Sequence, residues 1–150
     1  MKKTNNKGFS LVELIVVVAI MAVLMVVVGP QLLRYVERSR IQRDNTAISE
    51  IANAAKIAMA DETINGTIAN GAHQDIQADA TGVFTFTAGT GTLLGELNLT
   101  LGATLELDSN AYTGGAQPGI RVAKDGTGNV TVTSLNLVEQ DGSTGLNVTY

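Results

Sequence analysis

A single carboxylate, that of Glu13, lies near the start of a long apolar run and is the first candidate for chemistry in this chain. From Phe9 to Pro30 it is the only ionisable side chain. A run of this length can cross a bilayer as a helix. A carboxylate costs on the order of 2.5–3.5 kcal/mol at the centre of a membrane helix and less near an end, so a charge there usually serves a function. The expected partner is a positive group on another copy of the same chain.

The residues before this run form a short basic leader, Met1–Gly8, with three lysines and no apolar segment of its own. Gly8 is followed by the aromatic Phe9, and Glu13 is the fifth residue after Gly8. An ordinary secretory signal peptide has an apolar core of about 7–15 residues and then a small-residue cleavage site. The run here is longer and is followed by bulky leucines. An uncut signal anchor fits the length and the charge, but it explains neither Glu13 nor Gly8.

Gly8, Phe9 and Glu13 at this spacing resemble the leader and N-terminal helix of type IV pilins and of the pseudopilins of type II secretion. The resemblance is close from Lys7 to about Pro30. It implies that a membrane-embedded prepilin peptidase cuts between Gly8 and Phe9 and methylates the new amino group of Phe9. It also implies that Glu13 pairs with the methylated amine of Phe9 on a neighbouring subunit.

The helix is predicted to continue beyond Pro30 to about Ala60, with a different pattern. Apolar residues recur there at helical spacing and describe one stripe of an amphipathic helix. Pro30 removes a backbone donor and Gly29 weakens the turn, so we expect a kink or local unwinding at this pair. In related filaments the segment before the matching proline is melted. The predicted stripe consists of Ile41, Asp44, Ile48, Ile51, Ala55, Ala58 and Met59.

The remaining residues, 61–150, read as a loop followed by short strands. Residues 61–80 have turn signals and no sustained period, and the strands after them are rich in Thr and Gly. The clearest hairpin has Asp125-Gly126-Thr127-Gly128 as its turn. The predicted fold class is therefore α+β, pilin-like, with the long helix packed on a C-terminal antiparallel sheet. The predicted strands are 83–87, 97–107 with a break at Gly102, 119–124, 129–134 and 145–150.

Composition excludes several classes of site. There is no cysteine, so neither a disulfide nor a thiolate metal site can form. Removal of the leader leaves seven cationic against 14 acidic side chains, a net charge of −7, which argues against a nucleic-acid partner. His73 lacks partners for catalysis or a metal and is read as a surface loop residue. The segment Asp108–Tyr112 lacks the glycine and glutamate of a calcium loop and is read as a turn. We expect no catalytic residue, metal or cofactor.

The sequence thus predicts the precursor of a structural filament subunit and not an enzyme. Residues 1–8 are a cleaved leader, 9–30 the membrane and filament-core half of the helix, 31–60 its amphipathic half and 61–150 the globular part. The expected partners are other copies of the chain, prepilin peptidase, the inner-membrane assembly platform and, before assembly, the membrane itself. The final location is an extracellular pilus that serves adhesion or motility. The alternatives are a pseudopilin of secretion or competence, and a solitary anchored surface module that binds a ligand.

Overall fold

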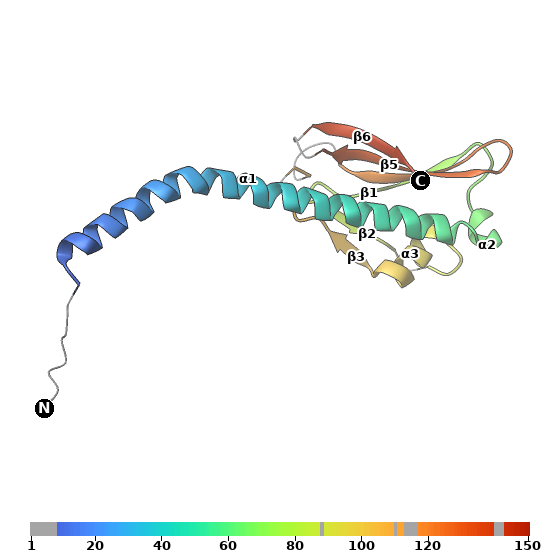
Figure 1. Ribbon diagram of the computed structural model, residues 1–150. Helices are drawn as coiled ribbons and strands as arrows, with labels where there is room; N and C mark the ends of the chain where they lie inside the picture. The colour runs from blue at the N-terminus through green and yellow to red at the C-terminus, as the bar shows by residue number, and fades with distance from the viewer. Residues whose placement is uncertain (1–8, 88, 110, 113–116, 140–142) are drawn as a thin grey trace, which may run out of the picture. The chain divides into compact units, whose positions relative to one another are not determined.

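The computed structural model describes residues 9–87, 89–109, 111–112, 117–139 and 143–150. It consists of a long N-terminal helix followed by an α+β part, which confirms the predicted fold class (Figure 1). The chain divides into two compact units, Met1–Val36 and Glu37–Tyr150. Three helices and six strands follow one another along the described residues: α1 (Leu11–Ala58), α2 (Glu62–Asn65), β1 (His73–Gln77), β2 (Val83–Thr85), α3 (Leu93–Leu101), β3 (Thr104–Glu106), β4 (Gly119–Lys124), β5 (Val130–Val138) and β6 (Thr144–Thr149).

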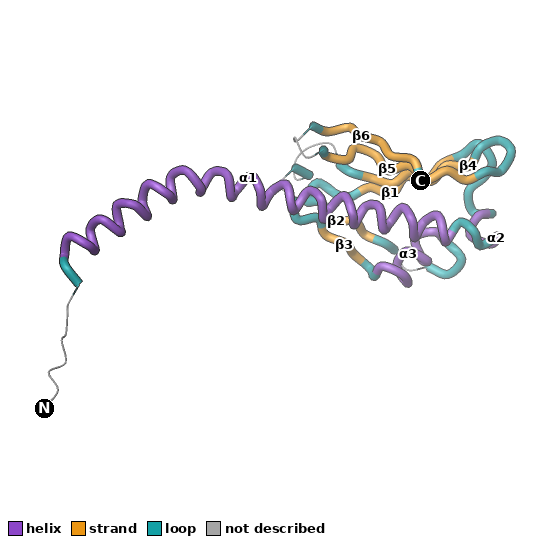
Figure 2. The backbone as a smooth tube through the Cα atoms, in the orientation of Figure 1, coloured by secondary structure: helices purple, strands orange, loops and turns teal. Residues whose placement is uncertain are grey.

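The strands of the second unit form a four-stranded sheet in the order β1-β4-β5-β6 and a two-stranded sheet of β2 and β3 (Figure 2). All pairings are antiparallel. β4 has the predicted bounds, while β5 continues past the predicted end to Val138. The prediction of a loop over 61–80 was wrong, because this segment contains α2 and β1. β1 is an edge strand in which only Ile76 is buried, so its sequence shows no apolar alternation.

The predicted strand 97–107 was also wrong in its first half, which is helix α3. The alternating leucines of this segment fit a strand face, but Leu93 and Leu97 are spaced one helical turn apart and both are buried. The Thr92 side chain accepts a hydrogen bond from the Gly95 N–H at 3.1 Å and so caps the helix. Gly95 lies against the Gly89 backbone, where a Cβ would come within 1.5 Å of the carbonyl oxygen. Only the second half, β3, is a strand.

The core of the second unit forms where the predicted stripe of α1 meets the sheets. Ile48, Ile51 and Ala55 are fully buried, and the central strands contribute Ile120 and Val122 to the same cluster. Side chains from α3 and from β2 complete it. The amphipathic pattern predicted from the sequence is therefore confirmed, since all but one of its residues are buried and Ala58 is partly buried.

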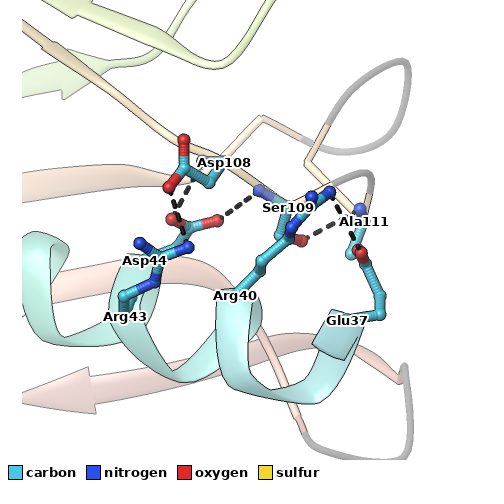
Figure 3. Close-up of polar contacts among 7 residues, drawn as sticks. All are labelled: Glu37, Arg40, Arg43, Asp44, Asp108, Ser109 and Ala111. Carbon is cyan, nitrogen blue, oxygen red and sulfur yellow. Dashed lines mark hydrogen bonds and ion pairs between the residues drawn. The ribbon is translucent and has the colours of Figure 1, made fainter. Parts of the chain in front are cut away.

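A buried carboxylate joins α1 to the segment after β3. Asp44 is only 3% exposed. Its Oδ1 accepts the Asp108 N–H at 3.0 Å and its Oδ2 accepts the Ser109 N–H at 2.8 Å (Figure 3). Arg43 adds an exposed ion pair with Asp108 at 3.0 Å. Burial raises the pKa of Asp44, while the two backbone N–H groups act in the opposite direction.

Two further polar contacts tie α1 to the C-terminal strands. The Tyr112 hydroxyl donates to Asn45 Oδ1 and accepts the Val138 N–H, and Asn45 Nδ2 donates to the Val138 carbonyl at 2.8 Å. One turn later, the Ser49 and Tyr150 hydroxyls are 2.8 Å apart. Residues 44, 45 and 49 thus hold three distant segments of a chain that contains no cysteine.

The predicted β4–β5 hairpin is confirmed, and a carboxylate organises its turn. Asp125 Oδ1 accepts hydrogen bonds from the Thr127 and Asn129 N–H groups, each at 2.8 Å, and from the Thr127 hydroxyl. Gly128 has a φ of +94°, a conformation that glycine adopts without strain. These hydrogen bonds to the charged form lower the pKa of Asp125 from 3.8 to about 2.

Replacing Asp44 with Ala should destabilise the second unit by about 2 kcal/mol, because two backbone N–H groups lose their acceptor. Thermal unfolding of the full chain in detergent, followed by the near-ultraviolet circular dichroism of its aromatic side chains, measures the loss. Thr46→Ala, at an exposed position two residues further along α1, is the matched control and should change the stability by less than about 0.5 kcal/mol. Equal effects of the two substitutions would show that the Asp44 contacts do not hold the fold.

The turn also predicts a pH dependence. Because the folded pKa of Asp125 lies below 3.8, its contribution to stability is present above about pH 4 and is lost as the pH falls toward about 2. Asp125→Asn keeps an acceptor oxygen but does not titrate. The difference in unfolding temperature between wild type and this variant should therefore narrow on acidification from about pH 5 to about pH 2. A difference that stays constant over this range would contradict the assignment.

Candidate processing and assembly site

The residues expected to be processed lie at the beginning of the first unit. Phe9 is 91% exposed, and both Phe9 and Ser10 precede the first helical residue, Leu11. Gly8, the other half of the predicted cleavage site, lies outside the described residues. Cleavage between Gly8 and Phe9 and methylation of Phe9 therefore stay predictions.

Glu13 has a partner within its own chain. Its Oε2 accepts the Ser10 N–H at 2.9 Å, while the Leu14 N–H donates to the Ser10 carbonyl at 3.2 Å. Ser10 is thus the N-cap of α1 and Glu13 is its third helical residue, where negative charge is favoured by the helix dipole. The sequence analysis assigned Glu13 only a partner on another subunit. The Ser-x-x-Glu spacing from Ser10 to Glu13 was the signal for this contact.

The side chains after Glu13 are apolar and uncovered on every side of the helix. Every residue of α1 from Leu11 to Val28 is exposed. α1 contains an 18-residue window with a mean hydropathy of 3.2, none of it buried by the rest of the described chain, and is the one described helix long and apolar enough to cross a membrane. A helix that is apolar all round must be covered by lipid or by other protein. This segment therefore fits a membrane-anchored precursor.

Gly29 and Pro30 lie within α1, whose described residues are helical on both sides of the pair. A side chain at Gly29 would meet no atom within 4 Å. Packing within a single chain therefore does not require a glycine at this position. The predicted melting of this turn concerns the assembled filament and stays a prediction.

The other candidates from the sequence belong to the second unit. His73 is exposed, as expected, but it is the first residue of β1 and not a loop residue. Asp108 and Ser109 lie in the segment after β3 and donate their N–H groups to Asp44, while Asn110 of the predicted turn lies outside the described residues. Among the described residues no group of three or more His, Cys, Asp or Glu side chains is placed to hold a metal ion.

The comparison with known families decides what the first unit is. Residues 3–29 match the family described as the prokaryotic N-terminal methylation motif. The chain carries the N-terminal signature of type IV pilins and pseudopilins. The match covers the leader, Glu13 and the apolar run, and it ends at the residue before Pro30. No curated protein and no solved structure matches the chain.

This signature, together with the exposed apolar helix, supports a pilin-like or pseudopilin-like precursor. The methylation motif implies processing by a prepilin peptidase and a context of pilus assembly. The motif lies wholly within the first unit. It therefore says nothing of what the second, globular unit (Glu37–Tyr150) contacts.

Proposed function

We propose that this chain is the precursor of a type IV pilin, which is cut between Gly8 and Phe9 and assembled as many copies into a helical filament. Before assembly, residues 9–30 anchor the subunit in the membrane. During assembly the segment leaves the lipid, through the inner-membrane platform, and enters the core of the filament. The globular residues 61–150 face outward and set the surface used in adhesion or motility.

The observation that carries this proposal is the uncovered apolar surface of α1 together with its methylation motif. A soluble monomer would not leave the whole of Leu11–Val28 exposed, because burial of each Val, Leu, Ile or Met side chain in it is favourable by about 1.5–3 kcal/mol. Lipid satisfies this requirement before assembly. Copies of the same segment, packed against one another, satisfy it afterwards.

Glu13 supplies the polar contact that apolar packing lacks. Two apolar helices can shift along each other at little cost. Lipid tails are as apolar as leucine side chains, so no hydrophobic force fixes the axial register of the helices. A buried carboxylate must find a positive group, and cleavage creates one at the methylated amine of Phe9 on the neighbouring subunit. The pairing compensates the buried charge and favours one axial register, so its main contribution is specificity.

Glu13→Ala should insert into the membrane at least as well as wild type, because a charge is removed from the apolar segment. Filament assembly should fail or become slow, since the incoming subunit has lost its electrostatic register. The measurement is the yield of sheared filaments divided by the amount of mature, membrane-bound subunit. Glu13→Gln, which keeps the shape but not the charge, should show the same defect.

Glu139→Gln is the matched control, because it changes the net charge equally at an exposed position of the globular unit. It should assemble at the wild-type level. A normal filament yield from Glu13→Ala would show that apolar packing alone sets the register, and the charge-pair mechanism would have to be dropped. If the gene for this chain lies among genes for secretion and not among genes for pili, the chain would be a pseudopilin with the same subunit chemistry.

A further inference from the structure

Four Asn-X-Thr triplets lie in the part of the chain that follows α1, and each matches the acceptor pattern for an asparagine-linked sugar. Triplets of this kind also arise by chance in a chain rich in threonine, so the sequence alone does not rank them. The structure separates them by what the side-chain amide of each asparagine already contacts. The four asparagines are Asn65, Asn98, Asn129 and Asn147.

In three of the four triplets the amide nitrogen of the asparagine donates a hydrogen bond within the chain. Asn65 Nδ2 donates to a backbone carbonyl at 3.1 Å and Asn98 Nδ2 to another at 2.7 Å, and these residues lie in helices α2 and α3. Asn129 Nδ2 donates to Asp125 Oδ2 at 3.1 Å and to the Thr127 hydroxyl at 3.0 Å. Transfer of a sugar to any of these nitrogens would first have to break its contacts.

Asn147 differs, because its amide nitrogen has no hydrogen-bond partner among the described residues. The side chain is exposed, and its Oδ1 accepts the Asn136 N–H at 3.2 Å, so the side chain is held by its oxygen. Thr149 is exposed as well. It shares a face of β6 with Asn147, since alternate residues of a strand share a face and Val148 between them packs against the core. The two residues that define the triplet therefore both point away from the core.

β6 also lacks the charges and prolines that commonly protect an edge strand. It is the last strand of the sheet in the order β1-β4-β5-β6, and its sequence contains neither a charged residue nor a proline (Figure 1). The strand at the opposite edge, β1, carries Asp75. An uncharged edge invites pairing with a strand of another chain. A bulky and soluble group in β6 would block such pairing.

We propose that Asn147 is the acceptor of an asparagine-linked oligosaccharide, which a lipid-linked sugar donor supplies on the outer side of the membrane. This inference rests on the proposed function, because it needs residues 61–150 to leave the cytoplasm. In the transfer, Asn147 Nδ2 forms a bond to C1 of the first sugar, and the bond between C1 and the phosphate oxygen of the donor breaks. The lipid phosphate leaves with the electron pair, one amide proton passes to a base of the transferase, and nothing is oxidised or reduced.

The test is the intact mass of the full chain taken from membranes and filaments of the cells that encode it, with fragmentation to locate any added sugar. We expect the wild-type chain to carry the sugar on Asn147. Asn147→Gln and Thr149→Ala should both lose the added mass completely, whereas Thr149→Ser, which keeps the hydroxyl, should retain it. Asn129→Gln is the matched control at the other exposed triplet, and it should leave the added mass unchanged.

A wild-type chain without sugar on Asn147 would overturn the inference, as would an added sugar that survives in Asn147→Gln. If the unmodified chain shows β6 amides protected from hydrogen exchange in filaments but not in detergent, a second copy covers this edge and the inference is again wrong. The same spectra report on the leader. A chain that still carries residues 1–8 would contradict the proposed function, whereas a chain that begins at Phe9 without sugar would contradict this inference alone.

Discussion

The structure depends on a change of hydrophobic pattern along one helix. From Leu11 to Val28 α1 is apolar all round, and from Ile41 to Met59 it is apolar on one stripe. The second pattern can be covered by the chain's own sheets, and it is. The first pattern is left uncovered by the rest of the described chain, so lipid or other protein must cover it. The proposed membrane anchoring and assembly with other copies would both meet that physical requirement.

In the globular unit, a small Gly- and Thr-rich sheet must be held together without disulfides. Its polar side chains on α1 bind backbone groups of distant segments, with Asp44 on the turn after β3 and Asn45 on the end of β5. Burying Asp44 is costly for its charged form. Two charge-assisted backbone hydrogen bonds offset part of this cost and fix one position for the turn. Such contacts specify the arrangement of segments that apolar packing alone would leave loosely defined.

Sequence reasoning succeeded where one local pattern had one physical meaning. The apolar run, the stripe from Ile41 to Met59 and the Asp125 turn are patterns of this kind. It failed for α3, where Leu97–Leu101 fits both a strand face and a helical stripe and the decision comes from Thr92 and Gly95. It also failed for β1, a polar edge strand that exists because β4 offers a partner. These outcomes depend on tertiary contacts.

The polar contacts also divide into local ones, which the sequence can reveal, and long-range ones, which it cannot. The Asp44 contacts join residues 64 and 65 positions apart, and no local pattern could reveal them. The Ser10–Glu13 contact is local, and its spacing was visible in the sequence. It was missed because the resemblance to pilins had already supplied Glu13 with a role between subunits.

The central claim is that the leader is removed and that the processed chain is the one that assembles. The most direct measurement is the intact mass of subunits taken from sheared filaments, with fragmentation to locate the first residue. Our account predicts a chain that begins at Phe9 and carries one methyl group on its amino terminus. Filament subunits that still carry residues 1–8 would contradict it.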